Sequence, residues 1–171
     1  MKAIAFIASM FLAVSLLFNA CSQTARYTKE IKEVMENSNL DFKLTEDDEN
    51  LDYSDKYEKA EGFGCYSLLS EDGLTRYTVS GYPDCLDEYK LTGFLTYDSK
   101  YSVFGFRVGD DPDSAITILE ERSYKKVEEK SSLTTFVYKK GKVFIQVFAE
   151  NDEIKSISIY LDISNKKNVV F

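Results

Sequence analysis

The clearest pattern of apolar and polar positions lies between residues 101 and 161. An apolar run over residues 103–108 is followed by Gly-Asp-Asp-Pro-Asp, and then by apolar residues at helical spacing. Asp111 can accept hydrogen bonds from the free N–H groups of a helix start, and Pro112 suits the first helical position. The pattern therefore predicts a strand and then a helix that begins at Pro112. The apolar stripe of this helix is formed by Ala115, Ile116 and Leu119.

Three apolar runs after the helix predict an antiparallel meander. Lys140-Gly141 is predicted as a two-residue turn between the first two runs, because glycine readily adopts the positive φ that such a turn needs. This turn would place Tyr138 opposite Val143. Both side chains would then lie on one face of the sheet, because successive residues of a strand point to opposite faces.

The second turn of the meander falls near Asn151. A two-residue loop at Asn151-Asp152 would place Val147 opposite Ser156 and mix apolar with polar positions on one face. A three-residue loop, which places Val147 opposite Ile157, is therefore predicted. The helix is expected to cover the resulting apolar face, formed by Phe136, Tyr138, Val143, Ile145, Val147, Ile157, Ile159 and Leu161.

The opposite face of the meander is also partly apolar. Phe144, Phe148 and Tyr160 lie on this face in the predicted register, together with Val137. Such residues need a cover, either from the first half of the chain or from another protein. Phe144, Phe148 and Tyr160 are therefore the candidate interaction surface.

The chain before this region predicts further strands over residues 63–69, 74–82 and 89–97, with a hairpin turn at Asp72-Gly73. Together with the meander, they predict an α+β fold: an antiparallel β-sheet with one helix packed on a face, preceded by an N-terminal signal segment and a tether.

Two segments before residue 62 are harder to interpret. Residues 25–36 have apolar residues at helical spacing, so they form either a short amphipathic helix or a partly ordered tether. Residues 41–61 contain nine acidic residues and three lysines, which is typical of a solvated linker. The predicted organisation is a signal peptide over residues 1–20, an N-terminal tether and acidic linker over 21–61, and an α+β domain over 62–171.

The N-terminus has the features of a targeting segment. Lys2 is followed by sixteen uncharged and mostly apolar residues, from Ala3 to Phe18. This run is shorter than the roughly 20 residues of a membrane span and fits the apolar region of a signal peptide. The run ends in Leu-Leu-Phe-Asn-Ala-Cys-Ser, with Cys21 directly after Ala20.

This ending resembles the signal peptides of bacterial membrane lipoproteins, in which a small residue precedes an invariant cysteine. The match covers about twenty residues; Ala20 and Cys21 fit it, whereas Phe18 and Asn19 depart from the residues most usual there. The resemblance implies that Cys21 is lipidated and becomes the new N-terminus after cleavage. It also implies a protein attached to a membrane of the cell envelope by a lipid anchor and facing outside the cytoplasm.

The order of strand, Gly-Asp, helix and meander resembles the repeat unit of beta-lactamase-inhibitor-like lipoprotein domains. The resemblance covers about sixty residues, and Phe-Gly-Phe-Arg-Val-Gly-Asp-Asp-Pro-Asp-Ser-Ala-Ile-Thr-Ile-Leu-Glu-Glu carries most of it. Domains of that family pack helices on an antiparallel sheet and bind other proteins. The resemblance therefore implies a possible protein partner, and no binding residue is transferred from it.

Composition excludes several classes of function. The formal net charge of −8 argues against a nucleic-acid-binding protein, which needs clustered Lys and Arg for phosphate contacts. The chain has no histidine, which removes His-based catalytic triads and His-containing zinc sites. No metal and no cofactor are predicted. Carboxylates are abundant, so a carboxylate-dependent hydrolase remains an alternative.

Cys65 and Cys85 are the only cysteines besides Cys21. An even pair in a protein outside the cytoplasm indicates one disulfide, and two buried free cysteines are the alternative. A bridge between them would close a loop of about twenty residues and stabilise the fold by ~3 kcal/mol in the chain-entropy description.

These observations predict a lipid-anchored, non-catalytic module that binds a protein or takes part in envelope assembly. A carboxylate-dependent hydrolase and a small-ligand sensor at the membrane are the alternatives. An exposed aromatic face would favour the first, a cleft with converging carboxylates the second, and a closed apolar pocket the third.

Overall fold

The computed structural model describes residues 28–53, 55–62, 64–82 and 85–163, and the side chains of residues 82–88 lie outside this description. The described residues form an α+β fold with two α-helices and two antiparallel sheets. The helices are α2 (Lys29–Glu36) and α3 (Pro112–Glu121), and the short 3₁₀ segments are η1 (Asp48–Asn50) and η2 (Glu128–Lys130). The strands are β1 (Ser38–Asn39), β2 (Tyr57–Gly62), β3 (Cys65–Ser70), β4 (Thr75–Tyr82), β5 (Cys85–Thr96), β6 (Ser102–Val103), β7 (Phe106–Arg107), β8 (Lys125–Lys126), β9 (Thr135–Lys140), β10 (Val143–Glu150) and β11 (Glu153–Leu161).

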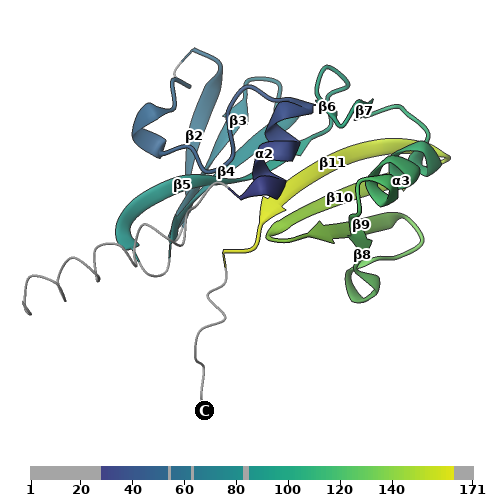
Figure 1. Cartoon of the computed structure of the whole chain (residues 1–171). Helices are drawn as coiled ribbons and strands as arrows, with labels where there is room; N and C mark the ends of the chain where they lie inside the picture. The colour runs from purple at the N-terminus through teal and green to yellow at the C-terminus, as the bar shows by residue number, and fades with distance from the viewer. Residues whose placement is uncertain (1–27, 54, 63, 83–84, 164–171) are drawn as a thin grey trace, which may run out of the picture.

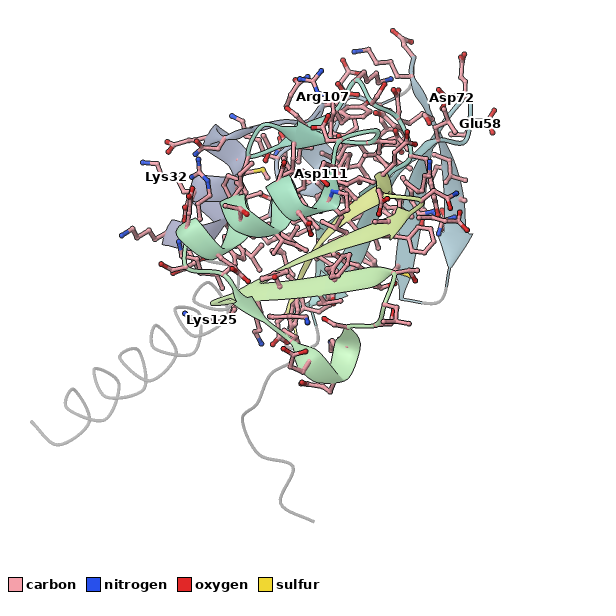
Figure 2. All side chains as sticks on the ribbon, turned by 90° about the vertical axis from the view of Figure 1, so that its right-hand side faces the viewer. Lys32, Glu58, Asp72, Arg107, Asp111 and Lys125 are labelled. Atoms are coloured by element: carbon pink, nitrogen blue, oxygen red, sulfur yellow. The ribbon has the colours of Figure 1, made fainter. Side chains whose placement is uncertain are left out.

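The main sheet is assembled from two meanders. Its strand order is β2-β3-β4-β5-β11-β10-β9-β8, so each meander is continuous and the two meet where β5 pairs with β11 (Figure 1). The second sheet is small and has the order β1-β6-β7. Figure 2 shows the two ends of the main sheet, with Glu58 and Asp72 at the β2–β4 end and Lys125 at the β8 end.

Two helices, rather than the one predicted, cover one face of the main sheet (Figure 1). Ile31 and Val34 of α2 share a single buried core with Ala115 and Leu119 of α3 and with the apolar face of the meander. The open alternative for residues 25–36 is therefore decided in favour of a helix over Lys29–Glu36, while residues 25–27 lie outside the described residues. Thr28 caps it, with its side-chain oxygen accepting from the N–H of Ile31.

The predicted acidic linker over residues 41–61 is wrong, because this segment is part of the folded unit. Leu44 and Leu51 are buried in the main core, and the Thr45 N–H donates to the Leu91 carbonyl oxygen of β5 at 2.7 Å. Residues 57–62 form β2, the edge strand of the main sheet. Most acidic residues of this segment are exposed, whereas Leu44, Leu51 and Tyr57 are buried. The folded unit therefore begins well before residue 62, although the net charge of the segment suggested a linker.

The predicted strand over residues 103–108 is instead a tight hairpin. β6 and β7 are two residues each and are joined at Phe104 and Gly105, which both have positive φ. A positive φ is unusual for Phe104, but its N–H donates to the Asn37 carbonyl oxygen and its ring packs edge-on against Tyr124. Tertiary contacts therefore override the local strand signal.

The start of α3 agrees with the prediction. Asp111 is the N-cap and its carboxylate accepts from the Ser114 N–H at 3.0 Å, with Pro112 in the first turn (Figure 2). Ala115 and Leu119 are buried, whereas Ile116 is half-buried against the core.

The predicted register of the first meander hairpin is wrong by two residues. Lys140 pairs with Val143, so the turn is Gly141-Lys142, and Tyr138 lies opposite Ile145 instead of Val143. Gly141, with φ of 57°, occupies the first turn position. A shift of two residues leaves every side chain on its predicted face, because the strand period is two.

The second hairpin has the predicted register but reaches it differently. Val147 pairs with Ile157, as predicted, yet the loop is the two-residue turn Asn151-Asp152, with φ of 54° and 59°. Lys155 is an extra residue between the pairs Phe148↔Ser156 and Ala149↔Ile154. This β-bulge restores the alignment of apolar residues that a two-residue loop alone would lose.

The buried position of Ile145 allows a test of the register. Its side chain is 0% exposed and lies between Tyr138 and Ile159. Ile145→Ala is expected to lower the free energy of unfolding by about 2–5 kcal/mol through lost burial and a cavity. The neighbouring Gln146 points to the other face, and Gln146→Ala is the control, with an expected cost within roughly 0.5 kcal/mol. Urea denaturation followed by circular dichroism measures both, and equal costs would contradict the assigned faces.

Candidate functional site

The face of the main sheet opposite α2 and α3 holds a small apolar cluster of its own. Val137 and Phe144 are buried there, yet neither belongs to the main core. The segment after β8 folds back over this corner: the Val127 N–H donates to the Val137 carbonyl oxygen, and Ser131 Oγ accepts from the Val137 N–H. The β9–β10 corner is therefore covered by the chain itself, whereas no described helix packs on this face. We call it the second face.

Phe144 and Tyr160 stack on each other at this corner. They are directly opposite in the β10–β11 ladder, with ring centroids 4.8 Å apart and planes inclined by 4°. Lys139 is the neighbour of Phe144 on the other side, and its Nζ lies 4.4 Å from the Phe144 ring centroid. Lys130 of η2 places its Nζ 4.5 Å from the same centroid. Two ammonium groups thus lie against one ring, and Phe144 is only 6% exposed.

A cavity of about 480 Å³ lies beside this stack. The Nζ of Lys139 is paired with Oδ2 of Asp162 at 3.0 Å, whereas Lys130 is exposed and makes no ion pair with any described residue. Burial raises the pKa of Tyr160, so its hydroxyl stays protonated at neutral pH. The cavity is lined by Val127, Glu129, Lys130, Lys139, Phe144, Tyr160, Leu161, Asp162 and Ile163.

The structure brings together two of the three residues predicted as the interaction surface. Phe148 lies on the second face, opposite Thr135 and Ser156, but it makes no ring contact with Phe144 or Tyr160. That the three residues bind a partner stays a prediction.

The lysines at the stack were missed by the sequence analysis. Lys139 could have been found from the correct register, since it is the cross-strand neighbour of Phe144. Nothing in the sequence around Lys130 predicts its contact with Phe144, because this contact forms only when the chain folds back after β8.

A second polar arrangement joins three distant parts of the chain around Asp41. The hydroxyls of Tyr57 and Tyr101 both donate to Oδ2 of Asp41, at 2.5 and 2.6 Å, and lie 2.9 Å from each other. The Tyr77 hydroxyl oxygen accepts from the Asp41 N–H at 2.9 Å. The sequence gives no sign of this cluster, because Asp41 is 16 residues from Tyr57 and 60 from Tyr101.

The protonation of this cluster follows from burial and hydrogen bonding. Burial alone would raise the pKa of Asp41, but the hydroxyls of Tyr101 and Tyr57 outweigh it and hold the pKa below its ordinary value. Burial, and then the hydrogen bond to Asp41, raise the pKa of both Tyr57 and Tyr101. Asp41 is therefore ionised at neutral pH and accepts hydrogen bonds from two hydroxyl groups. An ionised carboxylate is a poor general acid. Here it holds three distant segments of the chain together, and we call this arrangement the clamp.

The described carboxyl groups whose pKa is clearly shifted do not support the hydrolase alternative. Acid–base chemistry by two carboxyls needs one group whose pKa is raised. Each of these groups instead has a lowered pKa: Glu30, Asp41, Asp72, Asp111 and Glu153.

Within the described part of the chain, neither a metal-binding group of side chains nor a membrane-spanning helix is found. No group of three or more cysteine, aspartate or glutamate side chains is placed there to hold a metal ion. None of the helices found in the described ranges combines the length and the apolar character that crossing a membrane requires.

The predicted cysteine roles are not decided by the structure. Cys21 and the signal segment lie outside the described residues. Cys65 is a half-buried free cysteine at the start of β3, and the side chain of Cys85, at the start of β5, lies outside the description. β4 separates the two strands, so residues in register on them are about 10 Å apart, farther than a disulfide spans. The bridge between Cys65 and Cys85 stays a prediction, and it requires the end of the β4–β5 hairpin to bend toward β3.

Comparisons with known proteins leave the site to be interpreted from its own chemistry. No protein-family model matches the chain, and neither a curated protein nor a solved structure matches it. The resemblances to lipoprotein signal peptides and to beta-lactamase-inhibitor-like domains therefore stay predictions.

The tyrosine–aspartate cluster predicts a specific loss of stability in alkali. Folding raises the pKa of Tyr57 and Tyr101 above the ordinary value of 10.0. The stability that their protonated hydroxyls contribute is therefore fully present below about pH 10, and it is lost as the pH rises through the folded-state pKa values. Tyr57→Phe is expected to make the free energy of unfolding fall less steeply between about pH 8 and pH 11 than in the unaltered protein.

Tyr97→Phe is the matched control for this experiment, since Tyr97 is exposed and carries the same hydroxyl. Urea denaturation at each pH gives the comparison, and the shared neutralisation of lysines cancels between variants. Identical slopes for Tyr57→Phe and the unaltered protein would contradict the clamp.

Proposed function

We propose that the protein is a lipid-anchored module of the cell envelope that faces outside the cytoplasm and binds a partner protein through the second face of its main sheet. The anchor is supported by the resemblance of the first twenty-one residues to lipoprotein signal peptides, with Cys21 as the lipidated residue. A lipid on Cys21 would place the anchor seven residues before Thr28, the first described residue, and so keep the described unit close to the membrane.

The observation that carries the binding role is the Phe144–Tyr160 stack beside its cavity. The face is not the exposed aromatic surface that was expected, because Phe144 is buried and Tyr160 is half-buried, so the cavity beside the stack provides the contact. Aromatic pairs on a sheet face without a covering helix are a common feature of protein interfaces, where ring surface is buried around a few charged groups. The stack contributes ring edges and a cavity of about 480 Å³, a size that a large apolar side chain of a partner can enter.

The charges at the stack favour a partner segment that carries an acidic side chain. Lys139 is already neutralised by Asp162, but Lys130 has no ion pair among the described residues and is exposed. An acidic group on the partner would pair with Lys130 while its apolar neighbour contacts Tyr160. This arrangement combines one buried apolar anchor with one charge at the rim.

The anchor is tested by changing the lipidated residue. Cys21→Ser is expected to release the mature protein from membranes or to leave an uncleaved precursor, because serine cannot form the thioether that the resemblance implies. Detergent-phase partitioning and the mass of the recovered protein measure the outcome. Cys65→Ser is the control and should stay in the detergent phase. A mature Cys21→Ser protein that still partitions into detergent would contradict the anchor.

The binding face is tested by site-specific photocrosslinking in cells that make the full chain. A photoreactive residue at Gln146 lies on the second face, between Phe144 and Phe148 along β10, whereas one at Thr117 lies on the exposed side of α3. A discrete protein adduct is expected at position 146 and not at 117.

The crosslink at position 146 should also depend on the charge at the stack. Lys130→Glu is expected to weaken the adduct, because it places a like charge against the proposed acidic group. Lys29→Glu is the charge-matched control, since Lys29 is exposed on α2, on the other side of the sheet. Equal adducts at positions 146 and 117, or no effect of Lys130→Glu, would contradict binding through this face.

A further inference from the structure

A second depression, of about 360 Å³, lies on the other side of Tyr160 over the middle of the main sheet. Tyr160 is opposite Gly93 in the β5–β11 ladder, and Gly93 is opposite Thr78 in the β4–β5 ladder. One ring face of Tyr160 is stacked on Phe144. Because Gly93 has no side chain, the other ring face borders the depression, whose volume is within the range of small-molecule sites.

The missing side chain of Gly93 leaves space above the backbone at the bottom of this depression. Its φ is not in the left-handed region, so its backbone conformation does not itself require glycine. A Cβ at this position would instead come within 3.3 Å of the Thr78 Cβ and stand on the floor. Glycine inside a strand often marks a place where a ligand approaches the backbone closely. Here the absent side chain opens the space between Tyr160 and Thr78.

Several polar groups around the depression are not used within the described part of the protein. The Thr78 and Ser158 hydroxyls and the Arg76 guanidinium form no hydrogen bond or ion pair there. The Ser80 hydroxyl oxygen accepts from Thr92 Oγ1 at 3.0 Å, which leaves its own proton available. Arg76, Thr78 and Ser80 of β4 therefore present one guanidinium and two hydroxyls across Gly93 from the Tyr160 ring, while Leu95 separates Arg76 from Ser158.

The charge of the depression is opposite to that of the chain. Arg76 is the only charged residue in the described lining, and no aspartate or glutamate contributes to it, although the chain has a formal net charge of −8. A guanidinium with no partner is suited to a carboxylate, which it can bind through two parallel hydrogen bonds.

We propose that this depression binds a sugar ring that carries a carboxylate, as in a hexuronic acid residue. The C–H face of the pyranose stacks on the free ring face of Tyr160, because weakly positive C–H groups are attracted to the negative face of an aromatic ring. The ring lies over Gly93, its hydroxyls bond to Thr78 and Ser80 of β4, and the carboxylate pairs with Arg76 of the same strand. A neutral sugar leaves Arg76 without a partner, and an aliphatic acid leaves the two hydroxyls unused.

The test is a titration of the full chain in detergent micelles with methyl glucuronide and methyl glucoside, followed by isothermal calorimetry. The two probes differ only at C6, which is a carboxylate in the glucuronide and a hydroxymethyl group in the glucoside. Methyl glucuronide is expected to bind at least about ten-fold more tightly than methyl glucoside, because a charged contact to Arg76 is lost in the latter. Equal affinity of the two sugars, or no heat from either up to about 10 mM, would overturn the proposal.

Variants locate the binding and separate it from loss of folding. Arg76→Gln is expected to reduce glucuronide binding to the level of glucoside, while Arg107→Gln, at an exposed arginine of β7, leaves it unchanged (Figure 2). Thr78→Val removes one hydroxyl at nearly constant shape and is expected to weaken both sugars. Circular dichroism confirms that each variant is folded. Unchanged glucuronide binding in folded Arg76→Gln overturns the proposal, independently of the photocrosslinking outcome at position 146.

Discussion

The β5–β11 ladder is the contact on which the rest of this fold depends. Four residue pairs join the β2–β5 meander to the β8–β11 meander, and within the described main sheet no other strand pair connects the two halves. The same ladder determines both faces of the sheet. Ile159 lies opposite Phe94 in the core, and the next pair sets Tyr160 opposite Gly93 on the second face. A slip of one residue would exchange these faces and expose the core residues to solvent, so the fold and the second face share one register.

The helices that cover the core face are joined by a small ionic network. Glu33 of α2 pairs with Lys140 of the β9–β10 hairpin at 2.6 Å and with Arg122 after α3 at 3.5 Å, and Lys140 Nζ also donates to the Arg122 carbonyl oxygen. All three side chains are partly buried, so much of the Coulomb energy is offset by desolvation. The network therefore fixes the mutual position of α2, α3 and the hairpin more than it stabilises them. Apolar burial beneath both helices supplies the main stabilisation.

Local chemistry could be predicted from the sequence far better than contacts between distant segments. The cap at Asp111, the faces of the meander and the turn at Gly73 all depend on residues a few positions apart, and all three agree with the structure. The bulge at Lys155 was not predicted, because two different loop and bulge combinations give the same alignment of side chains. The clamp at Asp41 and the cation–π contact between Lys130 and Phe144 could not be predicted, since both depend on chain segments that meet only after folding.

The two lysines against Phe144 differ in how firmly they are held, and this difference determines what the second face can do. Lys139 is held in the ladder near the end of β9 and is paired with Asp162, so its ammonium is fixed by both contacts. Lys130 is exposed on a short 3₁₀ segment, and its cation–π contact is worth only about 0.5–1 kcal/mol at such a site. A ligand with an acidic group can therefore draw Lys130 away at little cost and uncover the ring edge of Phe144. Within the second face, only the Lys130 side of the Phe144 ring can be uncovered without breaking an ion pair.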